Sequence, residues 1–159
     1  MKNKHEIDPA SAKMLAILQR DGRLTLQELA ERVGLSTTPT WKRLKELERQ
    51  GVIDHYAAVL DRSKVDLGNC VLAEINLSRH AENVVEDFEA AVAACAPIIE
   101  CYSTTGQADY LLKVVTPDVA SYDQFLHEVV FRLPGVSSIR SSIVLREIKK
   151  AAPLPLEHL

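Results

Sequence analysis

The sequence predicts an α+β protein in which an N-terminal helix-turn-helix domain is followed by a ferredoxin-like βαββαβ domain. Three helices with distinct start and stop signals fill residues 8–51, and the second half repeats one strand–helix–strand unit. Charge divides in the same way. Residues 1–60 carry ten Lys and Arg against eight Asp and Glu, whereas residues 61–159 carry nine against fourteen. A basic module therefore precedes an acidic one.

The first helix is predicted to begin at Asp8-Pro9. Asp8 is a favourable N-cap, and a proline in the first helical turn has no amide bond to lose. Gly22 is expected to end this helix with a positive φ. The apolar residues that recur on one face are Met14, Leu15 and Leu18.

The second helix has the clearest signature. Thr25 and Glu28 have the spacing of a capping box, in which each side chain accepts a hydrogen bond from the other residue's backbone amide. Gly34 is expected to stop the helix. Its apolar face consists of Leu26, Leu29, Ala30 and Val33.

The third helix is predicted to begin at Thr38, because Pro39 then falls in the first turn, and to end at Gly51. In a helix-turn-helix, the second helix of the pair enters the major groove with its N-terminal residues nearest the bases. Hydroxyl groups can bond base edges or phosphates, and Lys and Arg neutralise phosphates. The candidate DNA contacts are Ser36, Thr37, Thr38, Pro39, Thr40, Lys42, Arg43 and Glu46. The alternative is a three-helix bundle for protein contacts, with solvated charges.

The predicted boundaries are 1–52 for the helix-turn-helix domain, 53–68 for a connecting strand and linker, and 69–159 for the second domain. In the second domain Phe88 and Phe125 lie 37 positions apart and mark two copies of one unit. The expected strands and helices are 71–77, 84–95 and 98–103 in the first copy, and 110–115, 119–133 and 137–145 in the second.

A four-stranded sheet with both helices on one face leaves the other face to be covered. Val71, Ala73, Ile75 and Leu77 alternate in the first strand, and either Leu112 with Val114 or Leu111 with Val115 alternates in the third. If one of these sets faces away from the helices, a second subunit is the natural cover.

The turn between the two copies concentrates polar chemistry. Gly106 lets a ligand approach the backbone, Thr105 offers a hydroxyl, and Asp109 can accept from an ammonium group. A free amino acid carries the ammonium and carboxylate that such a turn could satisfy. The alternative is an ordinary hairpin turn with Asp109 as a local turn-former.

The chain resembles the Lrp/AsnC, or feast/famine, family of transcriptional regulators along nearly its whole length. In the first half the resemblance rests on Asp21-Gly22-Arg23, Glu28-Leu29-Ala30, Val33-Gly34-Leu35-Ser36, Arg43-Leu44, Leu47-Glu48, Gly51-Val52-Ile53 and Tyr56-Ala57-Ala58-Val59-Leu60-Asp61. In the second half it rests on Thr105-Gly106, Asp109-Tyr110-Leu111-Leu112, Leu133-Pro134-Gly135-Val136 and Glu147-Ile148-Lys149. Thr40 departs from the family pattern, where valine or another small apolar residue is common, but its methyl group can still pack inward.

The resemblance implies a sequence-specific DNA-binding regulator, modulated by an amino acid or related small molecule, with a second domain of the RAM type. It implies sheet-to-sheet homodimers that assemble further to octamers, a palindromic operator on double-stranded DNA, and an effector site near the turn at contacts between dimers. Gly106 and Asp109 are the leading site residues. The adjacent candidates are Thr105, Gln107 and Tyr110, and the positions that line the pocket in relatives are Ser103, Val119 and Ser142.

Other observations exclude several classes. No apolar run is long enough for a membrane span, and the N-terminus lacks a signal core, so we expect a cytoplasmic protein. Cys70, Cys95 and Cys101 have no paired spacing, so neither a disulfide framework nor a zinc site is expected.

No nucleophile–base motif or phosphate loop appears, so we expect no enzyme and no cofactor. The alternatives are a siroheme decarboxylase, which shares both domains, and a DNA-compacting architectural protein.

Overall fold

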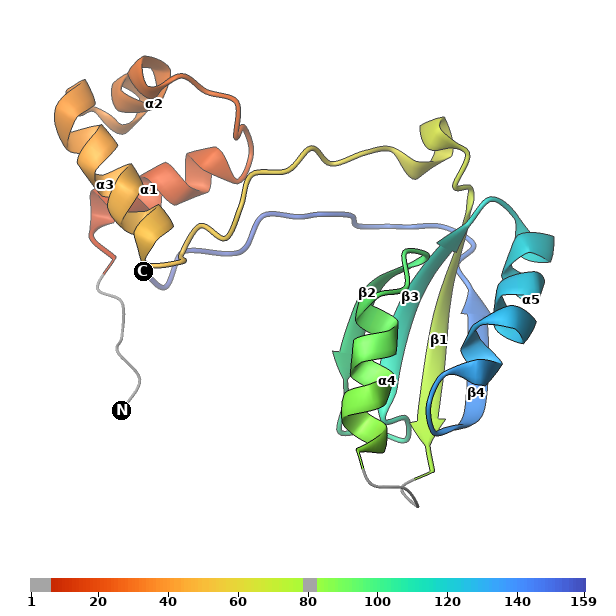
Figure 1. The fold of residues 1–159 in the computed structure, drawn as a ribbon. Helices are drawn as coiled ribbons and strands as arrows, with labels where there is room; N and C mark the ends of the chain where they lie inside the picture. Colours follow the sequence, from red (N-terminus) through yellow and green to blue (C-terminus); the bar gives the residue numbers. More distant parts are fainter. Residues whose placement is uncertain (1–6, 79–82) are drawn as a thin grey trace. The chain divides into compact units, whose positions relative to one another are not determined.

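The computed structural model describes residues 7–78 and 83–159. Its contacts divide the chain into two units. The first comprises Met1–Val59 with Lys149–Leu159, and the second comprises Leu60–Ile148 (Figure 1). The predicted functional boundaries at residues 52 and 68 stay a prediction.

Helix α1 of the first unit, Pro9–Leu18, begins as the sequence predicts. The Asp8 carboxylate accepts a hydrogen bond from the Ser11 amide at 2.9 Å, and Pro9 occupies the first position. The predicted end is wrong, because the helix ends at Leu18 with Gln19 as its C-cap. Gly22 does not adopt a positive φ. It instead gives room to a neighbour, since a Cβ there would lie 3.4 Å from Cδ1 of Tyr56.

Helix α2, Leu26–Val33, confirms the predicted capping box. The Glu28 amide donates to the Thr25 hydroxyl at 3.2 Å, and the Thr25 amide donates to the Glu28 carboxylate at 2.7 Å. Gly34 follows in the left-handed conformation, with φ of 85°. This is the conformation that favours glycine just after a helix.

Helix α3, Thr37–Arg49, begins two residues earlier than predicted. Its N-cap is Ser36 and not Thr38, so Pro39 is the third helical residue. Proline is tolerated there because the first four helical amides have no partner within the helix. Gly51 follows the helix with φ of 69°, as expected for its end.

The core of the first unit lies between these helices. Met14 of α1 packs with Leu29 and Val33 of α2, and Leu44 of α3 packs against them. After α3, the amides of Val52 and Ile53 both donate to the Leu47 carbonyl. Residues 54–61, expected to include a connecting strand, lie in neither helix nor strand in this chain.

The second unit has the predicted βαββαβ order. Its elements are η1 (Arg62–Val65), β1 (Asn69–Leu77), α4 (Val84–Ala93), β2 (Ile98–Ser103), β3 (Tyr110–Thr116), α5 (Val119–Glu128), η2 (Val130–Arg132) and β4 (Val136–Ile143). The strands form one antiparallel sheet in the order β2-β3-β1-β4. The helix predicted over residues 119–133 is shorter than expected: α5 ends at Glu128, and the 3-10 helix η2 follows it.

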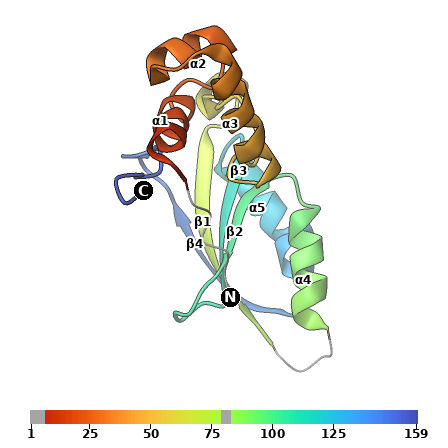
Figure 2. The same cartoon turned by 90° about the vertical axis from the view of Figure 1, so that its left-hand side faces the viewer.

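Helices α4 and α5 cover one face of this sheet (Figures 1 and 2). The predicted alternating set of β1 lies on this covered face, where Val71, Ala73 and Ile75 pack with Phe88 and Phe125 of the helices. The other face carries residues at the alternate positions, of which Leu72 pairs with Lys113 of β3 and with Ser142 of β4. No described helix covers that second face, which we call the open face.

Candidate functional site

The N-terminal end of α3 presents the predicted hydroxyl-bearing surface. Ser36, Thr37 and Thr38 are exposed, and Pro39 is half-buried. Ser36 accepts no hydrogen bond through its side chain from the helix that it caps, so its hydroxyl is available to an outside partner. These groups can donate to phosphate oxygens and can donate to or accept from base edges.

Thr40 is a correction to the predicted DNA-contacting set. Its side chain is fully buried, with 0% exposure, and its hydroxyl donates to the Ser36 carbonyl at 2.9 Å. A side chain in that position cannot reach a base edge or a phosphate. Thr40 therefore packs α3 into the unit, as an apolar residue would, and satisfies its hydroxyl locally.

The basic side chains of α3 differ in their surroundings. Lys42 is exposed, whereas the Arg43 Nε lies 3.3 Å from the Asp8 carboxylate. Asp8 therefore caps α1 and pairs with the third helix at the same time. The hydrogen bond from the Ser11 amide, together with the charge of Arg43, lowers the pKa of Asp8 below its ordinary value.

Glu46, also predicted to contact DNA, is held within its own helix. Its carboxylate pairs with the Arg49 guanidinium and accepts from the Gln50 side-chain amide. These hydrogen bonds lower the pKa of Glu46 to about 2. In this arrangement the Glu46 carboxylate balances the positive charge of Arg49. For Glu46 to contact a DNA base, its ion pair with Arg49 would have to open.

The turn that precedes β3 is exposed from Thr104 to Gln107. A Cβ at Gly106 would meet no atom within 4 Å, so nothing in the chain itself requires glycine there. Asp109 is already engaged, because its carboxylate accepts from the Leu77 amide at 2.9 Å. The carboxylate thus ties the start of β3 to the end of β1, and any ligand would share it with that bond.

Tyr110 points to the covered side of the sheet. Its ring packs on Phe88 with centroids 4.8 Å apart, and its hydroxyl donates to the Glu89 carboxylate at 2.6 Å. This hydrogen bond and burial raise the pKa of Tyr110 to about 12. The side chain is part of the core, and only its backbone lies beside the turn.

The remaining predicted effector residues do not gather around that turn within one chain. Ser103 ends β2 next to it, but Val119 begins α5 after the far end of β3. Ser142 lies on the open face opposite Leu72. The structure thus places these candidates in three separate locations of the unit.

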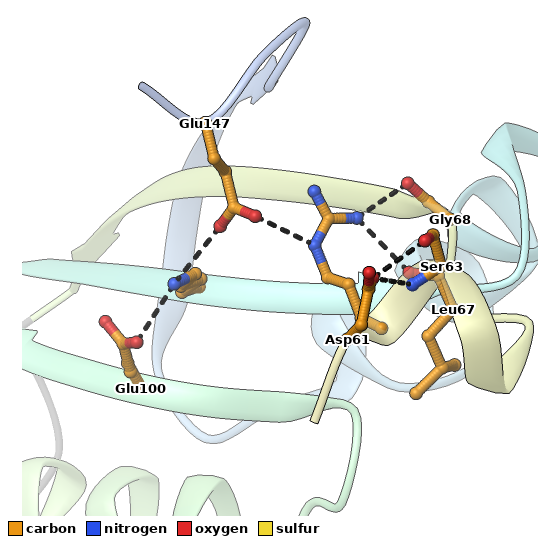
Figure 3. A network of polar contacts seen from close by, with 8 residues as sticks. Asp61, Ser63, Leu67, Gly68, Glu100 and Glu147 are labelled. Atoms are coloured by element: carbon orange, nitrogen blue, oxygen red, sulfur yellow. Dashed lines mark hydrogen bonds and ion pairs between the residues drawn. The ribbon is translucent and has the colours of Figure 1, made fainter. Parts of the chain in front are cut away.

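An ion-pair network crosses the open face (Figure 3). Lys113 lies 3.0 Å from Glu100 and 3.7 Å from Glu147, and the hydrogen bond to Glu100 raises the pKa of Lys113. The other oxygen of Glu147 lies 3.2 Å from Nε of Arg62, whose guanidinium also donates to the carbonyls of Leu67 and Gly68. The network therefore joins the segment that enters the second unit to the segment that leaves it.

Sequence reasoning missed Asp8 as a partner of α3, and it assigned no role to Arg62 or Glu147. The ion pairs join residues 35 and 85 positions apart in the chain. No local pattern marks such pairs. The one available signal was that Glu147 falls in a run shared with the family.

The described ranges contain neither a helix with the length and apolar character needed to cross a bilayer nor a cluster of side chains able to hold a metal ion. A helix-turn-helix unit with an exposed, hydroxyl-rich third helix is a module of the class that binds duplex DNA, and here it is joined to a separate ferredoxin-like unit.

The family profiles agree with this class. Residues 7–54 match a winged helix-turn-helix DNA-binding domain, and residues 70–154 match the Lrp/AsnC ligand binding domain. The chain belongs to the Lrp/AsnC family. It is accordingly a ligand-modulated, DNA-binding transcription regulator and not an enzyme.

Relatives cover nearly the whole chain. The leucine-responsive regulatory proteins of Escherichia coli K12 and Salmonella typhimurium are 41% identical over 152 residues, 96% of this chain and 93% of theirs. A transcriptional regulator from Neisseria meningitidis, solved in complex with L-Met, has a TM-score of 0.91 at 39% identity and covers 95% of this chain and 97% of its own. An AsnC family regulator from Agrobacterium tumefaciens has a TM-score of 0.90 at 36% identity, with 96% and 99% covered.

Proposed function

We propose that this chain works as a symmetric homodimer, or an assembly of such dimers, that binds a palindromic operator and changes its DNA binding or its assembly when an amino acid is bound. The observation that carries the DNA-binding half is the exposed surface of Ser36, Thr37 and Thr38, followed by Lys42 and Arg43. Two copies related by a two-fold axis would place one α3 in each half-site, about one helical turn apart. We place the protein in the cytoplasm with the DNA it regulates.

The amino-acid effector is proposed from the relatives. Some relatives are named for leucine, and the neighbour from Neisseria meningitidis was solved with L-Met. Both are amino acids with apolar side chains, so apolar amino acids are the first candidates. Their shared ammonium and carboxylate groups suit a site with a carboxylate, hydroxyls and backbone amides.

We propose that the effector site is completed by more than one chain. Its candidate residues occupy three separate places in one unit, and the 104–107 turn is exposed. A neighbouring copy could bring the turn of one chain against Val119 or Ser142 of another. The carboxylate of Asp109 and the backbone around Gly106 would then hold the ammonium and carboxylate of the ligand.

The open face is the proposed dimer contact. Leu72 and Leu111 form an apolar centre there, with Tyr102 beside them and the ion-pair network at one end. Packing two such faces would bury the apolar side chains and shield the network from water. Further assembly to octamers is proposed from the family.

Two measurements test this function. A thermal-shift screen of the twenty amino acids should find at least one that stabilises the protein, since a ligand of the folded state raises its stability. Selection from random duplex DNA should return two-fold symmetric sequences with half-sites about one helical turn, roughly 10 base pairs, apart. Failure of every amino acid to shift the melting temperature would refute the effector proposal, and recovery of unrelated sequences would favour architectural binding.

A further inference from the structure

The C-terminal segment of the chain lies against helix α1 in the first unit (Figure 2). It borders a cavity of about 630 Å³ whose other walls come from α1 and from the segment after α3. The apolar lining includes Leu15, Leu18, Val52, Ile53 and Leu156. Leu156 is also the one half-buried residue of the segment 151–159, whose other residues are exposed.

Gln19 holds this segment by its backbone. The Leu154 amide donates to Oε1 of Gln19 at 2.7 Å, and Nε2 of Gln19 donates to the Leu154 carbonyl at 3.3 Å. The side-chain amide of Gln19 thus bonds both the backbone N–H and the backbone C=O of one residue, as a neighbouring β-strand would. Such a contact recognises an extended peptide whatever its side chain.

The sequence of the segment suits this contact. Leu154 lies between Pro153 and Pro155, neither of which has an amide hydrogen. The Leu154 amide is therefore the single donor in this stretch, and Gln19 accepts from it. The two prolines also stiffen the segment, which lowers the entropy that docking must overcome.

We propose that the surface formed by Gln19, α1 and the segment Val52–Tyr56 is a docking site for the chain's own C-terminal segment, residues 152–159, and that its occupation supports DNA binding. The docked segment contacts α1 and lines the same cavity as Val52 and Ile53, which directly follow α3. It thereby lies against α1 and against the residues that continue from α3, and so steadies the C-terminal end of the recognition helix. This proposal goes beyond the proposed function and depends only on the ability to bind DNA.

Docking also gives the chain a second connection between its units. The first runs through residues 59–62, and the second leaves β4 through Glu147 and ends in the docked segment. In the second unit, Arg62 and Glu147 pair at 3.2 Å, so the starts of both connections are held together (Figure 3).

Four full-length variants test the docking site, with hydrogen exchange of the 152–159 segment and affinity for a duplex selected by the wild-type protein as readouts. Gln19→Ala removes the two hydrogen bonds to the Leu154 backbone. Leu156→Asp places a charge in the apolar lining of the cavity. Gln27→Ala is a matched control, since its side chain bonds only Glu31 one turn along α2 among the described contacts. Val85→Asp is the second control, because it adds the same charge at a side chain that is 41% exposed on α4 of the second unit, outside the unit that contains the docked segment.

We expect Gln19→Ala and Leu156→Asp to speed exchange in the segment and to weaken DNA binding by roughly threefold to tenfold, the range of one lost hydrogen bond or a little more. The two controls should stay within about twofold of the wild type. Unchanged exchange in both test variants would overturn the docking site. Faster exchange with unchanged DNA affinity would overturn its role in DNA binding, whereas a wild-type protein that selects no duplex would refute the proposed function instead.

Discussion

Asp8 serves two partners with one carboxylate. It caps α1 through the Ser11 amide and pairs with Arg43 of α3, and the cap lowers its pKa below the ordinary value of 3.8. A carboxyl group whose pKa is depressed by folding stabilises the folded state above its unfolded pKa. That contribution is lost as the pH falls through the lower, folded-state pKa.

Asp8→Asn should separate these two roles. Asparagine still caps a helix, so the free energy of unfolding should change by less than about 0.5 kcal/mol. The charge that competes with phosphate for Arg43 is lost, so affinity for duplex DNA at low salt should rise, by roughly threefold. Urea unfolding and fluorescence anisotropy measure the two effects. Weaker DNA binding would show instead that Asp8 orients Arg43 for its contact.

Asp109→Asn tests the effector site more sharply than removal of the side chain would. Asparagine keeps an oxygen that can accept from the Leu77 amide, so the strand connection survives, but the charge offered to an ammonium group is gone. We expect the affinity for the stabilising amino acid to fall by roughly tenfold to a hundredfold. Asp123→Asn, an exposed carboxylate on α5, is the control. Equal titration curves for both variants in thermal-shift assays would place the ligand elsewhere.

The roles of single residues were harder to predict from the sequence than the helices and strands. The candidate set on α3 followed from hydroxyl and basic side chains, yet burial removes Thr40 from it and intrahelical pairing occupies Glu46. The effector candidates near Gly106 share a turn, but Tyr110 points into the core. The direction in which a side chain points depends on the residues that pack against it, and those residues come from distant parts of the chain.

At the level of elements, α2 and α3 begin with different chemistry. Thr25 and Glu28 form a complete capping box, whereas Ser36 makes no side-chain hydrogen bond to its helix. Thr25→Ala should therefore lower the free energy of unfolding by about 1 kcal/mol, and Ser36→Ala should leave it nearly unchanged. Urea unfolding of the two variants checks this. Equal losses would mean that Ser36 caps α3 in solution after all.

Most elements could be predicted because their signals are local. Caps, glycines and the repeat marked by Phe88 and Phe125 predict the order of the helices α1–α5 and the strands β1–β4, most of them to within a few residues. The errors fall where two signals compete or where a signal is missing. Ser36 and Thr38 are both suitable caps, and the first helix ends at Leu18 before any residue that marks its end. The glycine expected there, Gly22, is instead explained by close approach to Tyr56.

For the whole molecule, the open sheet face is the main surface without a described cover. Leu72, which is 37% exposed, lies opposite Lys113 on that face. Leu72→Glu should fold, because the side chain at position 72 is partly exposed and the new carboxylate can reach water. It should weaken dimers by roughly a hundredfold, because a sheet-to-sheet contact would have to desolvate the charge. Sedimentation over a concentration range measures the change.

Val85→Glu provides the matched control for this prediction. Val85 is 41% exposed on α4, which covers the opposite face of the sheet. The same substitution there should leave the dimer intact. If both variants dimerise like the wild-type protein, the open face is not the contact between subunits.

Arrangements that span the whole chain lay beyond sequence reasoning. The docked C-terminal segment depends on Gln19 meeting Leu154, 135 positions away, and the open-face network depends on Arg62 meeting Glu147. Neither pair belongs to a repeating pattern or a capping motif. Only the folded structure brings them together.

The most direct test of the central claim, that α3 reads duplex DNA, is the salt dependence of binding to a selected duplex for the wild-type protein, Lys42→Ala and Arg43→Ala. Each lost phosphate contact should weaken binding and lower the slope of log affinity against log salt by about one. Both variants should unfold at the wild-type urea concentration, because both side chains are at least partly exposed. Affinities and slopes equal to those of the wild-type protein in both variants would contradict the assignment of α3 as the recognition helix.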